Sequence, residues 1–125
     1  MRAPRAAAPA AVREPNRLWR LAFGVALAVQ LIVLFSPFGV AGPGIPGLDK
    51  VVHVVVFFAP AFALLMMGIR ARWALGILAL QAFVSELIQG VGLVQRDGDF
   101  FDVMADLTGV ALAGLAYLVW TRRQH

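Results

Sequence analysis

The chain of 125 residues has no cysteine, a single lysine and only 14% charged residues. The lack of cysteine excludes disulfide bonds and a thiol nucleophile, and it leaves the redox compartment undefined. The low charge content excludes an ordinary soluble domain, in which about 25% of residues are charged. What remains is apolar, since 61% of residues are hydrophobic and the mean hydropathy is +0.81. The composition therefore indicates an integral membrane protein.

The basic residues outnumber the acidic ones, with a net charge of +4. Such a balance is also typical of nucleic-acid-binding proteins, but here the arginines stand at the ends of apolar segments. Arginine in that position orients membrane helices. We therefore expect membrane lipids as partners and no nucleic acid.

Four apolar segments are each long enough, or nearly so, for a helix that crosses about 30 Å of hydrocarbon. They predict an all-α membrane protein, a short bundle of four transmembrane helices in one domain, residues 17–123, with spans near 18–38, 50–69, 73–90 and 102–120. Residues 1–16 are rich in Ala, Pro and Arg and predict a disordered cytoplasmic tail. The first segment is alternatively a signal peptide with a small-residue site near residues 39–41.

Arginine placement predicts the orientation of the four spans. Only Lys50 and Arg96 lie in the two outer connections, and the remaining basic residues lie in the tails and in the connection after the second span. Because cytoplasmic segments carry the excess of Lys and Arg, we expect both termini in the cytoplasm. Trp73 and Trp120, at span ends, are typical of the interfacial aromatic belt.

Small residues predict the helix contacts. Ala105, Gly109 and Ala113 recur every four residues and form one stripe on the fourth helix, where another helix can approach closely. Gly24 and Ala28 predict a similar contact on the first helix.

Polar side chains gather at the predicted outer ends of three helices. A carboxylate inside an apolar helix is costly and is by default a functional hypothesis, which applies most strongly to Glu86. We expect these ends to meet and to form one ligand-binding site from eight residues: Asp49, Lys50, His53, Glu86, Gln89, Arg96, Asp102 and Asp106.

The spacing of these residues supports the site, and each also has a simpler role. Asp49 and His53 lie four residues apart, as do Asp102 and Asp106, so each pair shares a helix face. Asp49 and Asp102 are equally expected as helix N-caps, and Lys50 can extend to the headgroups. An ion-pair network that only holds the bundle together is the structural alternative.

Three kinds of chemistry fit these residue types. Imidazole and carboxylates can hold a divalent cation, although no close ligand pair is present. Glu86, His53 and Asp106 are the candidates for general acid–base catalysis. Lys50 and Arg96 can bind a phosphate or carboxylate group. The sequence specifies no metal site and no cofactor, and Ser85 lacks a partnered base.

Read in order, these motifs resemble the VanZ-like family of small membrane proteins. The match covers about residues 45–115: Asp49-Lys50-x-x-His53, then Glu86-x-x-Gln89, then Arg96, Asp102, Asp106 and Gly109 at the family's spacing. Three departures are Asp106 in place of Asn, Ala113 in place of a second Gly, and no proline between Gln89 and Arg96.

The resemblance implies a role in the cell envelope, because the family's namesake is associated with low-level resistance to teicoplanin, a lipoglycopeptide antibiotic. The implied location is the inner membrane of a bacterium, and the implied partner is a lipid-linked envelope precursor or a lipoglycopeptide on the outer face of that membrane. The alternatives are a structural membrane subunit, a metal-dependent lipid-headgroup enzyme and, with least support, an ion transporter.

Overall fold

The computed structural model describes residues 16–36, 45–91 and 100–125. Four helices account for most of this part of the chain: α1 (Arg17–Phe35), α2 (Leu48–Met66), α3 (Ala71–Gly90) and α4 (Phe100–Arg123). Each is long and apolar enough to cross a membrane. The prediction of an all-helical chain with four helices of membrane-spanning length and composition is therefore confirmed. The proposed tail lies outside the described residues except for Asn16.

The ends of α2 differ from the predicted span and have a backbone cause. Gly47 precedes the helix at φ 80° and Gly68 follows it at φ 85°, a left-handed conformation that glycine adopts without a steric penalty. The helix consequently begins at Leu48 and ends at Met66, about three residues before the predicted end. Pro60 lies buried within it, and the helix continues past that residue.

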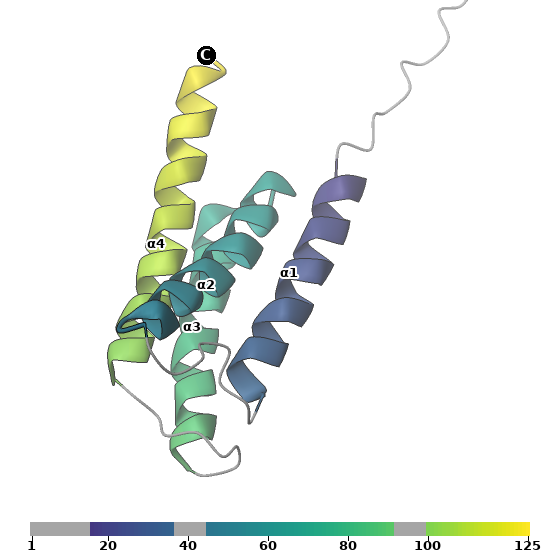
Figure 1. Ribbon diagram of the computed structural model, residues 1–125. Coiled ribbons are helices and arrows are strands. Elements are labelled where there is room, and N and C mark those ends of the chain that lie inside the picture. Colours follow the sequence, from purple (N-terminus) through teal and green to yellow (C-terminus); the bar gives the residue numbers. More distant parts are fainter. Residues whose placement is uncertain (1–15, 37–44, 92–99) are drawn as a thin grey trace, which may run out of the picture.

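Successive helices run in opposite directions, so alternate connections lie at opposite ends of the bundle (Figure 1). The start of α1, the connection between α2 and α3, and the end of α4 share one end. The starts of α2 and α4 lie at the other end. The described arginines thus gather at the first end, whereas Lys50 lies at the second.

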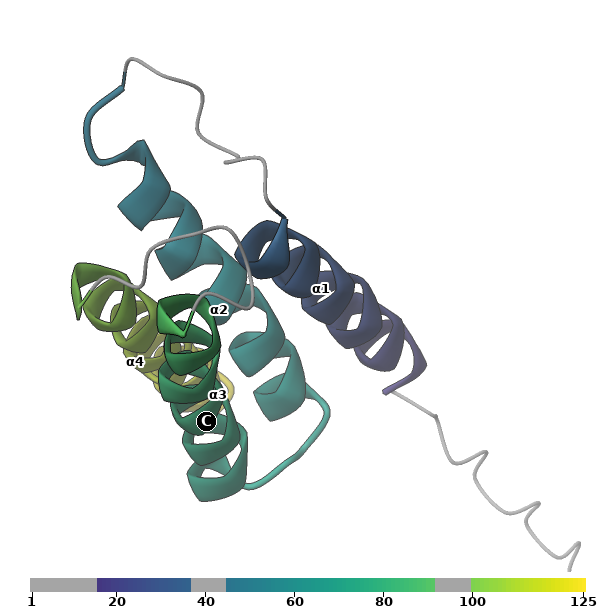
Figure 2. The same cartoon turned by 90° about the horizontal axis from the view of Figure 1, so that it is seen from below.

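Helix α2 lies between α1 and α4, and it contacts α4 most extensively (Figure 2). The buried core contains side chains from all four helices: Leu34, Phe57, Ala61, Leu78, Ala82, Val110 and Ala113. Many large apolar side chains on the outer faces are exposed, including Leu21, Val55, Leu80 and Leu115. An apolar exterior of this kind suits a lipid environment, in which there is no hydrophobic drive to bury it.

Gly109 is the point where α4 touches α2. A Cβ atom at this position would lie 2.2 Å from the backbone oxygen of Val54 and 3.1 Å from the backbone nitrogen of Phe58. Only glycine permits so close an approach of two helix backbones. Ala105 and Ala113 flank Gly109 and are buried, so the predicted stripe of small residues on α4 is confirmed.

The prediction of a similar stripe on α1 is wrong. Gly24 and Ala28 are exposed, and no atom lies within 4 Å of a Cβ built on Gly24. Helix α1 instead buries Gln30, Val33 and Leu34. Side-chain packing, rather than backbone approach, therefore joins α1 to the bundle, over this last part of the helix and also near its start, where Trp19 packs edge-on against Phe62 of α2.

Candidate functional site

Helix α2 brings three of the predicted site residues to one end of the bundle. Asp49 is the second residue of the helix, Lys50 the third, and His53 lies one turn deeper. The expectation that Asp49 caps the helix is wrong, because the N-cap position is occupied by Gly47. An acidic residue in the first turn still interacts favourably with the helix dipole.

Helix α4 supplies the facing carboxylates. Asp102 is the third residue of α4, so the helix begins too early for it to act as the N-cap. Asp106 follows one turn later, and both aspartates are buried. Their four-residue spacing places them on the face that packs against α2, as expected.

Two pairs of side chains join the helices. The Lys50 ammonium group donates to Oδ1 of Asp102 and also lies 2.9 Å from Oδ2 of Asp49. One turn deeper, Nδ1 of His53 and Oδ1 of Asp106 lie 2.7 Å apart and form a hydrogen bond. Nε2 of His53 is 3.8 Å from Oδ1 of Asp102. We call these five residues, Asp49, Lys50, His53, Asp102 and Asp106, the α2–α4 cluster.

Exposure falls steeply along the α2–α4 cluster. The side chains of Asp49 and Lys50 are 46% and 33% exposed, whereas those of His53 and Asp106 are 2% and 0% exposed. Oδ2 of Asp106 is buried and has no hydrogen-bond partner among the described residues. The cluster therefore has one accessible end, at Asp49 and Lys50, and one enclosed end, at Asp106.

Gln89 does not point into this cluster. Its side-chain amide donates to the backbone oxygen of Leu34 at 2.7 Å, near the end of α1. Carbonyl groups in the last turn of a helix lack a partner within the helix, so Gln89 supplies one from α3. This contact gives Gln89 a role in joining α1 to α3.

A pair of glutamine side chains also joins α1 to α3, and it was not predicted from the sequence. The amide nitrogen of Gln81 donates to the side-chain oxygen of Gln30 at 2.8 Å, and Gln30 is fully buried. A glutamine within an apolar segment was the available signal, because such a side chain needs a polar partner in hydrocarbon.

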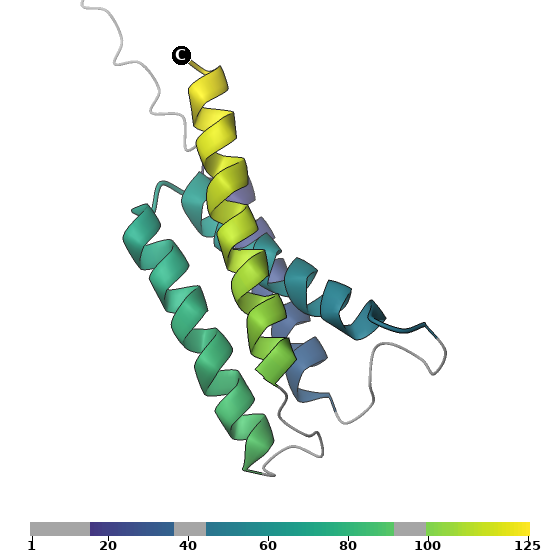
Figure 3. The ribbon, with the colours of Figure 1, turned by 90° about the vertical axis from the view of Figure 1, so that its left-hand side faces the viewer.

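Glu86 and Arg96 complete the predicted set. Glu86 lines a shallow surface groove of α3 and α4 with Phe83, Leu87, Phe100 and Val103. Figure 3 shows the end of α3 well separated from the start of α2, which tilts away from it. Arg96 lies outside the described residues. That Glu86 and Arg96 share a site with the α2–α4 cluster stays a prediction.

The described residues do not form a recognisable metal-binding site. Within 16–36, 45–91 and 100–125, no group of three or more His, Asp and Glu side chains is arranged to hold one. The Ser85 hydroxyl donates to the carbonyl of Ala82 at 3.1 Å, so it is held within its own helix. The Lys50 ammonium group already pairs with the carboxylates of Asp49 and Asp102, so an anionic group can bind there only by displacing one of them.

Comparisons of this chain with protein-family profiles, curated proteins and solved structures found no match. The resemblance to the VanZ-like family consequently rests on the residues and spacings alone.

Proposed function

We propose that this protein is a VanZ-like protein of the bacterial inner membrane that recognises a lipid-linked or amphiphilic molecule of the cell envelope. The α2–α4 cluster is its binding site for an anionic headgroup. One observation carries the proposal: Lys50 is partly exposed at the accessible end of a cluster whose other end is buried between two membrane-length helices.

The proposed orientation puts the cluster at the outer face. The described arginines and the N-terminal tail carry most of the positive charge, and segments rich in Arg and Lys stay in the cytoplasm. Both termini are then cytoplasmic, and Lys50 faces the envelope. This side of the membrane is where a lipid-linked precursor or a lipoglycopeptide such as teicoplanin is met.

Binding proceeds by exchange at the Lys50 ammonium group. Asp102 is the more buried partner and keeps Lys50 in place, while the exposed carboxylate of Asp49 gives way to the anionic group of the ligand. The hydrogen bond between His53 and Asp106 keeps α2 and α4 in register below the site.

The structural alternative has specific support, since the Lys50–Asp102 pair and the His53–Asp106 pair link the same two helices. A buried network of this kind can hold a bundle together without binding any ligand. A metal-dependent lipid-headgroup enzyme requires a ligand set beyond the described residues. An ion transporter requires polar groups along the membrane, and the Gln30–Gln81 pair is one such group in the described part.

Two substitutions at the accessible end separate binding from support. The protein is extracted gently from bacterial membranes, and its bound molecules are identified by native mass spectrometry. Lys50→Gln removes the cation and should lose the bound amphiphile. Asp49→Asn removes the competing carboxylate and should retain more of it, because the Lys50–Asp102 pair is left intact.

Equal unfolding temperatures of wild type and Asp49→Asn provide the folding control. The structural alternative expects neither variant to change the bound masses and expects both to unfold more easily. Bare protein in every case, or the same bound lipids in all three proteins, would overturn the proposed function.

A further inference from the structure

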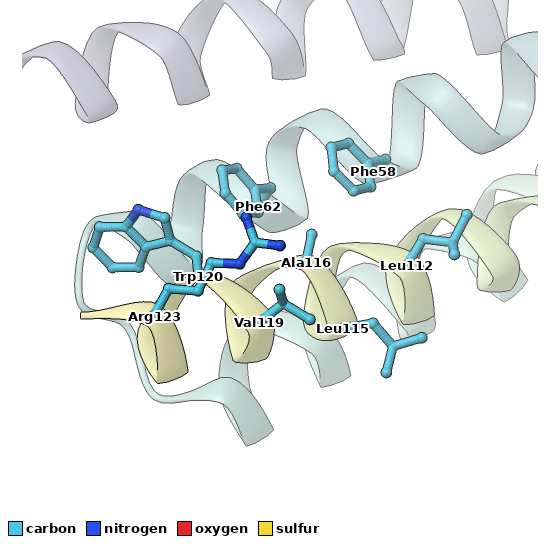
Figure 4. A pocket seen from close by; sticks show the side chains of 8 residues that line it. All are labelled: Phe58, Phe62, Leu112, Leu115, Ala116, Val119, Trp120 and Arg123. Carbon is cyan, nitrogen blue, oxygen red and sulfur yellow. The ribbon is translucent and has the colours of Figure 1, made fainter. Parts of the chain in front are cut away.

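An apolar groove runs along the opposite half of α4 from the α2–α4 cluster. Phe58 and Phe62 of α2 line one side, and α4 lines the other from Leu112 to Arg123 (Figure 4). Its volume is about 630 Å³, within the range of about 300–1,000 Å³ typical of ligand sites. Nothing in the α2–α4 cluster contributes to its lining.

The length of the groove matches one leaflet of a bilayer. From Leu112 to Arg123, α4 rises about 16 Å at 1.5 Å per residue. Half of the hydrocarbon thickness is about 15 Å. Leu112 also lies near the middle of α4, so in a bilayer centred on this helix the groove extends from the midplane to the surface at the C-terminal end.

The end of the groove at the membrane surface carries a positive charge. Figure 4 shows the Arg123 side chain reaching from α4 toward Phe62, across the mouth of the groove, with Trp120 beside it. Trp120 is 42% exposed, as suits a residue of the interfacial belt. A guanidinium group binds phosphate oxygens through two parallel hydrogen bonds. The groove thus pairs an apolar trough with a phosphate-binding group at headgroup level.

We propose that this groove binds one anionic phospholipid from the leaflet at the C-terminal end of the bundle. Arg123 holds the phosphate, and one acyl chain lies against Phe58, Phe62 and Leu112. Trp120 packs at the level of the glycerol backbone. The site is independent of the proposed function, because the α2–α4 cluster lies at the start of α4.

The test is a competition between two lipids of identical acyl chains. The full chain is purified in detergent, mixed with equimolar phosphatidylglycerol and phosphatidylcholine, and examined by native mass spectrometry. Wild type should retain one phosphatidylglycerol in preference to phosphatidylcholine. Arg123→Gln should reduce this preference about fivefold, the contribution of one arginine near an anionic membrane surface.

Arg122→Gln is the matched control, since Arg122 is exposed, has the same charge and does not line the groove. It should leave the preference unchanged. Ala116→Leu places a larger side chain on the groove wall and should reduce the retention of both lipids. Lys50→Gln should retain the lipid preference. Loss of ligand binding at the α2–α4 cluster and loss of lipid binding in the groove are therefore distinguishable.

Three results would overturn the proposal. Equal retention of the two lipids would show that the groove does not select an anionic headgroup, because both lipids carry the phosphate and differ in net charge. Equal losses in Arg122→Gln and Arg123→Gln would reduce the effect to general surface charge. A dimer that is disrupted by Ala116→Leu would show that a second copy of the chain, rather than a lipid, occupies the groove.

Discussion

Asp106 is the most deeply buried acidic side chain between α2 and α4 among the described residues. One of its oxygens accepts from His53, and the other has no hydrogen-bond partner among the described residues. Burying a charged or polar group is costly unless its hydrogen bonds are made. The two oxygens therefore contribute unequally to the free energy of unfolding, and we expect the hydrogen bond with His53 to be the stabilising contribution.

Replacing Asp106 by Asn or by Leu tests this inequality. Asp106→Asn keeps an oxygen that accepts from His53, so we expect little change in the free energy of unfolding. Asp106→Leu leaves the buried imidazole N–H without its acceptor, which costs about 1–3 kcal/mol. The measurement is thermal unfolding in detergent, followed by circular dichroism. If both variants lose stability equally, the negative charge itself is required.

At this scale the sequence predicted pairs on one helix better than partners on different helices. The spacing of Asp49 with His53, and of Asp102 with Asp106, was sufficient to expect shared faces. The partner of Gln89 was not predictable, because it is a backbone carbonyl on α1 rather than a side chain with a recognisable type. The caps expected at Asp49 and Asp102 failed because both helices begin earlier in the chain.

Among the helices, the contact between α2 and α4 decides the geometry of the cluster. Gly109 brings the two backbones together one turn from Asp106, so the pairs Lys50–Asp102 and His53–Asp106 are formed at the end of that contact. A helix pair held this closely limits how far its side chains can move apart. Backbone approach and ion pairing therefore support each other.

Gly109→Ala should separate α2 from α4. A Cβ only 2.2 Å from the Val54 oxygen cannot be accommodated without movement of a backbone. Overpacking of this kind costs about 1–3 kcal/mol, which outweighs the gain of about 1 kcal/mol in helix propensity. We expect a lower unfolding temperature in detergent for this variant.

Gly24→Ala is the matched control for this helix-contact prediction. It makes the same chemical change within a helix, but no atom lies within 4 Å of its new Cβ. Its unfolding temperature should equal or exceed that of the wild type. An unfolding temperature for Gly109→Ala as high as for Gly24→Ala would contradict the close packing of α2 on α4.

The helices themselves were predictable because apolar length and terminal arginines suffice to locate spans. Their contacts were predictable only in part. The stripe at Ala105, Gly109 and Ala113 predicted a real interface, whereas Gly24 and Ala28 predicted one that is absent from the described structure. Small residues permit close approach, but a partner with a complementary surface determines whether it occurs, and a single sequence does not specify that partner.

For the whole molecule, the arrangement of four antiparallel helices places the arginines and the α2–α4 cluster at opposite ends of the bundle. The described arginines lie at the end formed by the start of α1 and the end of α4, and the α2–α4 cluster lies at the other end (Figure 1). Near the arginine end, the Arg72 guanidinium group lies 5.6 Å from the ring centre of Trp73, an exposed aromatic residue suited to the interface. A bundle built in this way has a defined polarity across the membrane.

Because the chain has no cysteine, single-cysteine variants can measure this polarity without interference. Ile45 lies at the Lys50 end, while Ile69 and Gln124 lie at the arginine end, and all three are exposed. A membrane-impermeant maleimide applied to spheroplasts should label Ile45→Cys and leave Ile69→Cys and Gln124→Cys unlabelled. Inverted membrane vesicles should reverse the pattern. Labelling of Ile69→Cys and Gln124→Cys in spheroplasts would place the arginines outside, and the α2–α4 cluster would then face cytoplasmic rather than envelope molecules.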